Sequence, residues 1–194
     1  MSKNKKVWIV AVAVMGVALL LIVYQMLNGM GVEGEQRHKM GTISGIFKTL
    51  GTISVFLAAG SFWWIWFKKQ RKSPSSFIRG MGKLLHRLHE PLGWLALLLV
   101  VFHGGYYLIT DFQNRDTYSG IAAFLILLAI GGYGFFIQNI RNQWMRVIHR
   151  TLSIAWVPAL IIHAGGSAFM ATLLTLMVGV LVWVFGKKKV QQVG

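Results

Sequence analysis

Apolar residues are gathered into six long runs that short polar or basic segments separate. The runs cover residues 7–27, 49–67, 92–109, 121–137, 152–162 with the residues that follow, and 169–185. Most are close to the roughly 20 residues that cross a bilayer as a helix, and the two shortest gain length from their flanks. Because lipid offers the backbone no hydrogen bonds, such runs predict helices. We expect residues 1–194 to form a single all-α transmembrane domain, a six-helix bundle without a soluble flavin or nicotinamide domain.

The first run follows three lysines, so a cleaved signal peptide is an alternative to a retained helix. However, its apolar core of about 20 residues is longer than the roughly 7–15 of a signal peptide. No A-x-A-like cleavage site follows at residues 30–34. The sequence therefore favours a first helix that is kept.

The net charge of +15 is concentrated in segments that would share one side of the membrane. If the N-terminus is cytoplasmic and the chain crosses six times, the inside holds sixteen of the twenty basic residues and one acid, Glu90. The sixteen are Lys3, Lys5, Lys6, Lys68, Lys69, Arg71, Lys72, Arg79, Lys83, Arg87, Arg141, Arg146, Arg150, Lys187, Lys188 and Lys189. The positive-inside rule then predicts that both termini lie in the cytoplasm. We expect a multi-pass protein of the inner membrane. The rule explains the charge without nucleic acid, and a basic face also attracts anionic lipids or a phosphate-carrying partner.

Four of the six histidines form two pairs with one spacing, because His89 and His103 are 14 residues apart and so are His149 and His163. On a helix, 14 residues rise about 21 Å and return to within about 40° of the same face. The third and fifth predicted helices run in the same direction, since one helix separates them. His89 and His149 should therefore share the cytoplasmic level, and His103 and His163 the outer level.

Two imidazoles at each of two levels predict two bis-imidazole sites, as axial ligation of two haems requires. A weak internal repeat supports this arrangement, since leucine and glycine positions follow the histidines in step on both helices. Zinc or copper binding is an alternative, but two-imidazole sites suit haem iron better than a tetrahedral ion. Another alternative is that the histidines only hydrogen-bond a neighbouring helix. This alternative explains one residue more easily than four. The absence of cysteine excludes iron–sulfur ligation and disulfides.

His86 is a second candidate for the inner ligand, because the dipeptide His-Arg occurs both there and at His149. It is 17 residues from His103, which puts it roughly 100° around a straight helix from that face. Pro91 could kink the helix and reduce this angle. The angular argument favours His89 and leaves His86 as the alternative. His38, in the first outer loop, is expected to be solvated.

Other side chains near the pairs have two interpretations each. Arg87, Arg146 and Arg150 lie within one turn of the inner histidines and could bind haem propionates, although the charge rule also explains them. Trp94 and Trp156 fall between the two levels, where an aromatic ring could shorten the path between haems or simply pack. The three tryptophans at 63, 64 and 66 are expected to form an interfacial belt.

Glycines follow both outer histidines, as Gly104-Gly105 and Gly165-Gly166. They would let a flat macrocycle approach the backbone closely. Ordinary close helix packing explains such small residues equally well, as at residues 131, 132 and 134 of the fourth predicted helix.

Six helices with histidines 14 apart on the third and fifth resemble the ferric reductase-like transmembrane domain over nearly the whole chain. That superfamily includes ferric reductases, NADPH oxidases and the haem-binding membrane subunit of the periplasmic methionine sulfoxide reductase system. The resemblance implies b-type haem and electron flow from the cytoplasmic to the outer face. It makes His89 and His149 the inner ligands, and His103 and His163 the outer ones. Trp156 falls where the oxidases carry an aromatic residue between the haems.

Many members append FAD and NADPH domains, so this chain is most similar to the short, stand-alone bacterial members. The resemblance thus implies a membrane haem oxidoreductase component that needs a separate electron donor, either a cytoplasmic flavin reductase or quinol. The acceptor would be a ferric chelate or a periplasmic redox protein docking at residues 28–41 and 111–120. Two haems are expected, and one is an alternative.

Two other functions fit less well. Cytochrome b of quinol-oxidising complexes also places two histidine pairs on two helices, but this chain has no Pro-Glu-Trp-Tyr motif and its helix order fits less well. A small non-redox transporter or assembly factor would use the histidines for packing or metal binding. A haem spectrum separates that class from the others.

Overall fold

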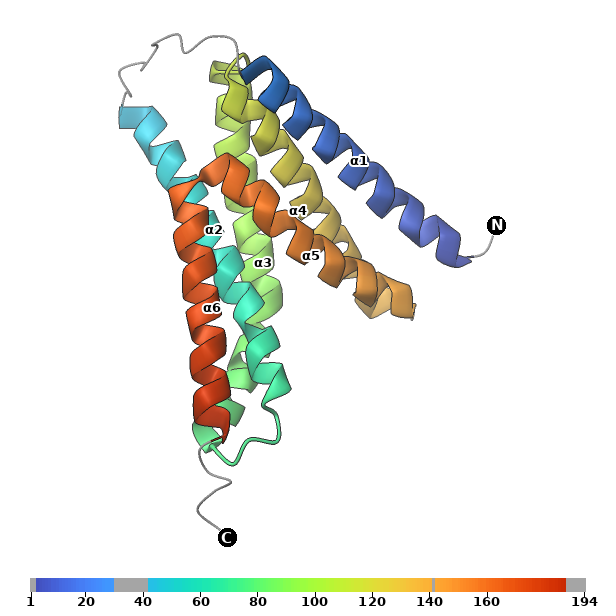
Figure 1. The fold of residues 1–194 in the computed structure, drawn as a ribbon, viewed down its shortest axis with the longest axis vertical. Coiled ribbons are helices and arrows are strands. Elements are labelled where there is room, and N and C mark those ends of the chain that lie inside the picture. Colours follow the sequence, from blue (N-terminus) through green and yellow to red (C-terminus); the bar gives the residue numbers. More distant parts are fainter. Residues whose placement is uncertain (1–2, 30–41, 141, 188–194) are drawn as a thin grey trace.

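The computed structural model describes residues 3–29, 42–140 and 142–187, and within them every regular element is a helix. The six helices are α1 (Lys3–Gly29), α2 (Thr42–Lys69), α3 (Ser76–Thr110), α4 (Arg115–Asn139), α5 (Gln143–Ala164) and α6 (Gly166–Lys187). All six are long and apolar enough to cross a membrane, as expected of a multi-pass membrane protein (Figure 1). The predicted all-α class, with six helices of the length and apolar composition that a membrane span needs, is therefore confirmed for the described residues.

Some sequence predictions concern residues outside these ranges. They are the part of the first outer loop at residues 30–41 with His38, and the basic residues Arg141, Lys188 and Lys189.

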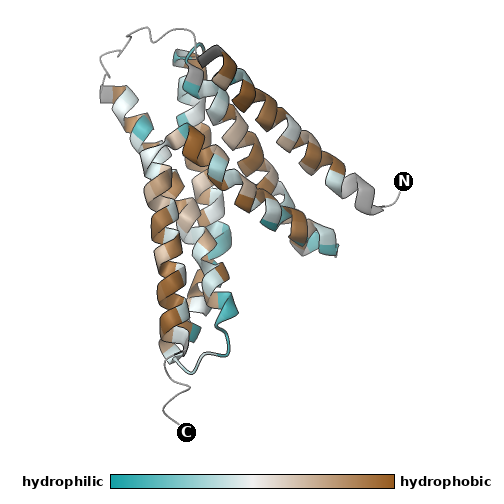
Figure 2. Ribbon diagram, viewed as in Figure 1, coloured by the Kyte–Doolittle hydropathy of each residue, from teal (hydrophilic) through white to brown (hydrophobic). Residues whose placement is uncertain are grey.

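The polar ends and the segment between α2 and α3 contrast with the apolar helix bodies in Figure 2.

The helices form two sets of three (Figure 1). α2, α3 and α6 stand together, while α1, α4 and α5 lean away from them toward the lower end of the figure. Each set has its own core, which in the first set includes Phe67, Ile78, Leu85 and Val182. The sets meet where α3 packs on α4 and α5 packs on α6. A group held between α3 and α5 therefore lies between the two sets.

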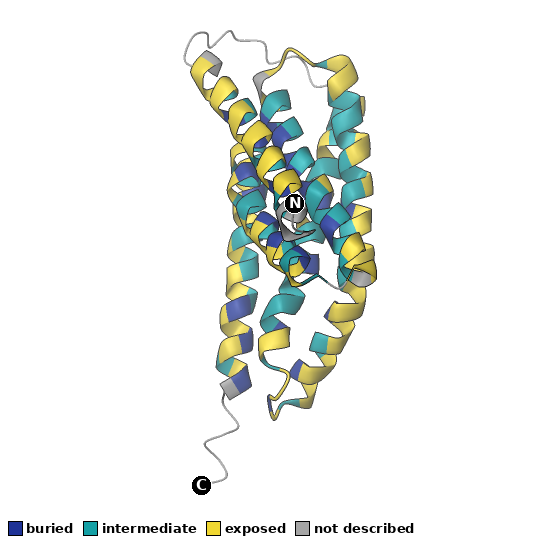
Figure 3. Ribbon diagram, turned by 90° about the vertical axis from the view of Figure 1, so that its right-hand side faces the viewer, coloured by how far each residue is buried: buried dark blue, intermediate teal, exposed yellow. Residues whose placement is uncertain are grey.

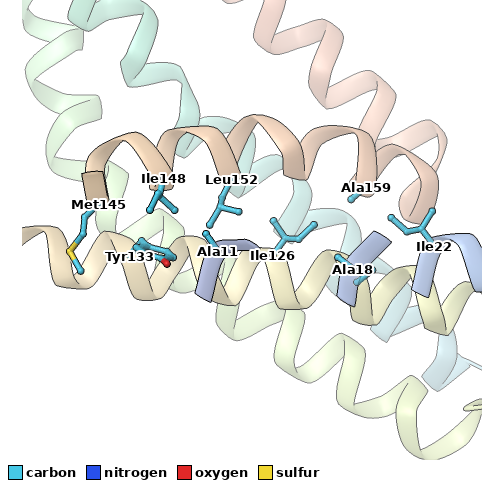
Figure 4. Close-up of a cluster of buried hydrophobic side chains, with 10 residues drawn as sticks. Ala11, Ala18, Ile22, Ile126, Tyr133, Met145, Ile148, Leu152 and Ala159 are labelled. Carbon is cyan, nitrogen blue, oxygen red and sulfur yellow. The ribbon is translucent and has the colours of Figure 1, made fainter. Parts of the chain in front are cut away.

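Small side chains let α1, α4 and α5 approach one another closely. Ala11 and Ala18 of α1 and Ala122 of α4 are buried, and they pack with the larger Ile126 and Ile148 (Figure 4). Between helices in lipid, van der Waals packing of this kind replaces the hydrophobic effect as the attractive force.

Large apolar side chains cover the outward faces of the bundle, where Figure 3 shows exposed residues along the helices. Leu20 is 71% exposed, Val180 60% and Ile109 87%. On a soluble monomer such a surface would promote aggregation, whereas in a bilayer it contacts lipid tails. The surface thus agrees with the length and composition of the helices.

α3 begins at Ser76, well before the apolar run that predicted it at residue 92. Between α2 and α3, only residues 70–75 lie outside helices. The helix has 35 residues and continues through Pro91. At 1.5 Å per residue it is about 52 Å long, against a hydrocarbon core of about 30 Å.

The early start of α3 has a local cause that hydropathy does not record. The Ser75 side chain caps the helix by accepting a hydrogen bond from the backbone N–H of Ile78. Ile78 and Leu85 are then buried against Phe67 of α2, while the basic residues of the same turns are exposed. An amphipathic segment of this kind is helical without being apolar on average.

α4 and α5 also begin earlier than the apolar runs. Asn114 caps α4 by accepting from the backbone N–H of Asp116 at 3.1 Å, and Asn142 caps α5 by accepting from that of Trp144 at 3.0 Å. The predicted outer loop at 111–120 therefore shrinks to residues 111–114.

Gly165 makes the turn between α5 and α6. It lies between the end of α5 and the start of α6, with φ of 54° and ψ of −121°. Only glycine adopts this conformation readily. The chain therefore reverses two residues after His163 through a single glycine.

The tryptophans at 63, 64 and 66 are half-buried around the core of α2, α3 and α6, and their place in an interfacial belt stays a prediction. The indole N–H of Trp63 donates to the Thr175 hydroxyl at 3.1 Å. The Trp66 ring lies against Gly179 of α6, where the missing side chain leaves room for it. α6 thus contacts the rings of Trp63 and Trp66.

Candidate functional site: two histidine pairs between α3 and α5

The structure brings four histidines together as two pairs. The ring centres of His89 and His149 are 6.2 Å apart and their planes meet at 84°. The ring centres of His103 and His163 are 6.1 Å apart, with an angle of 70°. All four side chains are half-buried. These are the pairs that the 14-residue spacing led us to expect, and their role as ligands stays a prediction.

In each of the four imidazoles, Nδ1 lies within hydrogen-bond distance of a backbone carbonyl oxygen on the preceding helix. The four distances are His89 to Ser61 at 2.9 Å, His103 to Phe47 at 2.8 Å, His149 to Ile130 at 2.9 Å and His163 to Asp116 at 3.1 Å. A carbonyl oxygen can only accept, so Nδ1 carries the proton in all four rings. Nε2 is then the nitrogen with a lone pair. Metal-ligating histidines commonly use their second nitrogen in this way.

Two of the imidazoles have a serine hydroxyl beside the same nitrogen. Ser61 Oγ is 3.0 Å from Nδ1 of His89 and donates to the His89 carbonyl at 3.2 Å. Ser119 Oγ is 3.3 Å from Nδ1 of His163 and donates to the Asp116 carbonyl at 3.0 Å. Each pair therefore contains one ring that a serine supports and one that a carbonyl alone supports.

Haem with two axial imidazoles fits this arrangement. A metal–imidazole bond is about 2 Å long, and Nε2 is about 1 Å from its ring centre, so two axial rings have centres about 6 Å apart. The two observed separations are 6.2 and 6.1 Å. In the described part of the chain, no group of three or more His, Cys, Asp and Glu side chains could hold a metal ion. The residues present fit a b-type haem at each pair.

Three glycines on α2 and α4 lie directly against the imidazoles. A Cβ atom built on Gly51 would be 2.7 Å from the His103 ring, one on Gly120 would be 2.8 Å from that of His163, and one on Gly134 would be 3.2 Å from that of His149. The first two were not among the predicted site residues, and the third was interpreted as helix packing. Their position inside apolar helices, where glycine is unfavourable, was the available signal.

His86 does not take part in the inner pair. Its ring stacks on Trp64 of α2, with centres 4.7 Å apart and planes at 23°. The side chain is exposed. Since α3 continues through Pro91, the straight-helix angle holds and His89 is the residue opposite His149.

The three arginines near the inner pair are all exposed. Arg87 belongs to α3, and Arg146 and Arg150 to α5. Propionate binding by these side chains stays a prediction, as does the simpler explanation from the charge rule.

Trp156 packs against the core of α1, α4 and α5, and its indole N–H donates to the Ala123 carbonyl of α4 at 2.9 Å. Trp94 is 46% exposed and meets Phe135 edge to face at 6.5 Å. These contacts support the packing interpretation for Trp156. A role between haems stays a prediction.

Of the glycines that follow the outer histidines, Gly165 is explained by the turn. Gly104, Gly105 and Gly166 have no other group within 4 Å of the position that a Cβ would take. The side chains of the protein thus leave the α3 backbone open next to His103.

The site consists of two bis-imidazole pairs between two sets of helices. No family model, curated protein or solved structure matches the chain. The role assigned to the pairs therefore rests on their own geometry and chemistry.

Proposed function

We propose that the protein carries electrons across a membrane with two b-type haems, one between His89 and His149 and one between His103 and His163. The observation that carries the proposal is the ring separation of 6.2 and 6.1 Å in pairs whose Nδ1 atoms all bond to carbonyls. Haem iron changes its oxidation state by one electron, which is the chemistry that this function needs. Membership of the ferric reductase-like transmembrane superfamily is part of the same proposal.

The residues of this chain hold and orient the two groups. Each imidazole offers Nε2 and is fixed through Nδ1, so neither ring can rotate without losing a hydrogen bond. On each helix the two ligands are 14 residues apart, about 21 Å along the axis. This spacing covers about two thirds of a hydrocarbon core of about 30 Å.

Charge supports an inward orientation for the end of the bundle at which α2 and α3 are joined. Lys68, Lys69, Arg71 and Lys72 are exposed there, and α6 ends at the same end (Figure 1). By the positive-inside rule we assign this end, with both termini, to the cytoplasm and the chain to the inner membrane. His89 and His149 then form the inner pair, and the outer pair faces residues 111–114.

The electron donor in this proposal is a separate cytoplasmic flavin reductase or the quinol pool. The exposed basic end suits a partner that carries phosphate groups, and it also attracts anionic lipid. On the outer face the acceptor is a ferric chelate or a periplasmic redox protein that docks at residues 28–41 and 111–120. The protein is thus the membrane component of an oxidoreductase.

Reduced-minus-oxidised spectra with haem quantification test the proposal. The protein purified after haem-replete expression should contain two haems per chain with sharp α and β bands. Alanine at His103 or at His163 should remove the outer haem and keep most of the inner one. A colourless protein would refute the proposal and favour a transporter or assembly factor, and a single haem would refute the two-haem version.

Oriented proteoliposomes test the direction. With an acceptor trapped on the outer-face side, reduction should require a donor on the basic side. Reduction that proceeds equally well when the donor is present only at the outer face would overturn the orientation. Strong inhibition by quinol-site inhibitors would identify the quinol pool, rather than a flavin reductase, as the donor.

A further inference from the structure

Three of the four imidazoles share one local arrangement with the helix that they face. His103 bonds to the carbonyl of Phe47 and lies against Gly51. His163 bonds to the carbonyl of Asp116 and lies against Gly120. The carbonyl and the glycine are four residues apart in both cases.

His149 repeats this offset of four residues. It bonds to the carbonyl of Ile130 and lies against Gly134 of the same helix. An offset that recurs on two different helices and at both levels indicates a common physical requirement.

Helix geometry supplies the requirement. Within a helix, the carbonyl of residue i already accepts the N–H of residue i+4, and its second lone pair is the one left for an outside donor. The Cβ of residue i+4 tilts toward the helix N-terminus, and therefore toward that carbonyl. A side chain at i+4 crowds the approach of a planar ring, and glycine leaves the approach open.

We propose that Gly51, Gly120 and Gly134 are positioning residues, which keep a carbonyl lone pair accessible and so fix the tautomer and the orientation of the imidazole ligands. This inference rests on the proposed haem ligation. A substitution at these glycines is expected to displace the ring, weaken the Nδ1–H bond and change the iron–Nε2 interaction.

The fourth imidazole provides an internal comparison. His89 bonds to the carbonyl and approaches the hydroxyl of the same residue, Ser61. The ring approaches this carbonyl beside the small side chain of Ser61 itself. The residue four positions later is Ile65, so this ring reaches its carbonyl without a glycine at the offset of four residues.

The distances rank the expected effects. At Gly51, a Cβ would lie 2.7 Å from both Cε1 and Nδ1 of His103, which ordinary packing does not tolerate. At Gly120 the closest approach is 2.8 Å, to Cε1 of His163. At Gly134 it is 3.2 Å, which the His149 ring can relieve by a shift of a few tenths of an ångström. Gly51→Ala and Gly120→Ala should therefore be severe and Gly134→Ala mild.

The experiment introduces alanine at the three glycines in the full-length protein and measures haem content, midpoint potentials and the low-spin EPR signals. Matched controls are Gly45→Ala on α2 and Gly132→Ala on α4, since neither position has a group within 4 Å of a Cβ. Alanine is the better helix former, so helix propensity alone does not impair any of these variants.

We expect Gly51→Ala and Gly120→Ala to fall from two haems to about one, with loss of the same haem that His103→Ala removes. Gly134→Ala should keep both haems and raise the midpoint potential of the inner one, because a weaker Nδ1–H bond makes the imidazole a poorer donor to ferric iron. The controls should keep two haems and wild-type potentials. If the wild-type protein binds two haems and the Gly51→Ala and Gly120→Ala variants are unchanged, this inference is wrong and the proposed function stands. Wild-type protein without haem would overturn both.

A double variant separates ligand positioning from plain helix packing. In His103→Ala the ring that Gly51 accommodates is gone, so adding Gly51→Ala should change neither the haem content nor the thermal midpoint. If the double variant unfolds or loses further haem, Gly51 serves the packing of α2 and the inference is wrong.

Discussion

The two histidine pairs have nearly the same ring separation but are held by different supports. In the outer pair, both rings lie against glycines whose Cβ positions would clash with them, at 2.7 and 2.8 Å. In the inner pair, Ser61 supports His89 from both its carbonyl and its hydroxyl, and Gly134 leaves more room for His149. The same ring separation can thus be held by a tight support or by one that leaves the ring room to shift.

The surroundings of the pairs differ as well. Trp64 is 5.9 Å from the His89 ring, and the Lys68 ammonium lies over that indole at 4.7 Å. Next to the outer pair, Tyr107 is 5.1 Å from His103 and donates to the Ser44 carbonyl at 3.3 Å. Among the described residues, lysine ammonium groups lie over aromatic rings on the side of the inner pair and not beside the outer pair.

The largest difference in haem content is expected between alanine variants of His89 and His86, the two candidates for the inner ligand. His89→Ala should remove the inner haem entirely, because it deletes an axial ligand, while the outer haem stays. His86→Ala should leave the inner spectrum nearly intact, because this ring stacks on Trp64. Haem quantification and the α band of each variant provide the measurement. The opposite result would mean that α3 is kinked at Pro91 in the membrane.

Gly165→Ala tests how far the outer pair depends on the turn that follows His163. At φ of 54° and ψ of −121°, alanine is strained, with an expected cost of about 1–3 kcal/mol. The thermal midpoint in detergent should fall, and the outer haem should be lost before the inner one on heating. Gly16→Ala in α1, which also has open space around its Cβ position, is the control and should be neutral or stabilising. Equal loss of both haems would mean that the turn stabilises the whole bundle.

Trp156→Phe removes the hydrogen bond to the Ala123 carbonyl and keeps an aromatic ring. The loss should be about 1 kcal/mol of stability, with both haems retained. Thermal unfolding followed at the Soret band and in the far-UV measures both effects. If a haem is lost although the fold is kept, Trp156 contacts a cofactor, as the resemblance implies.

The smallest effect is expected from the serines. Ser61→Ala keeps the carbonyl acceptor of His89 and removes the hydroxyl at 3.0 Å. The change of about 0.5–1 kcal/mol corresponds to roughly 20–40 mV for one electron, as a rise in the inner midpoint potential. Ser119→Ala should shift the outer potential less, because its hydroxyl is 3.3 Å from His163. Potentiometric titration resolves the two haems, and equal shifts would contradict the ranking.

The sequence predicted the helix number and the histidine pairs because both depend on one-dimensional periodicity. Runs of about 20 apolar residues mark spans, and a 14-residue interval returns to one helix face. The residue at which α3 begins was not predicted, for the same reason. Ile78 and Leu85 form an apolar contact surface only when Phe67 lies beside them.

The supports of the ligands could not be predicted from one sequence. Phe47, Ile130 and Asp116 contribute backbone carbonyls, which every residue has, so their side chains give no signal. Gly51 and Gly120 are visible as glycines, but their neighbours depend on how α2 faces α3 and how α4 faces α5. The helix contacts of the tryptophans at 63, 64 and 66 could not be predicted either, because lipid-facing and helix-facing aromatic rings look alike in sequence.

The contact between Gly51 and His103 also constrains how such a chain can change over time. While the histidine is present, any side chain at position 51 meets its ring, so drift at that position is blocked. A lineage that lost the histidine would release the glycine, and every larger residue would then become acceptable. The two positions should therefore vary together among descendants of a common ancestor, although they belong to different helices and are 52 residues apart in the chain.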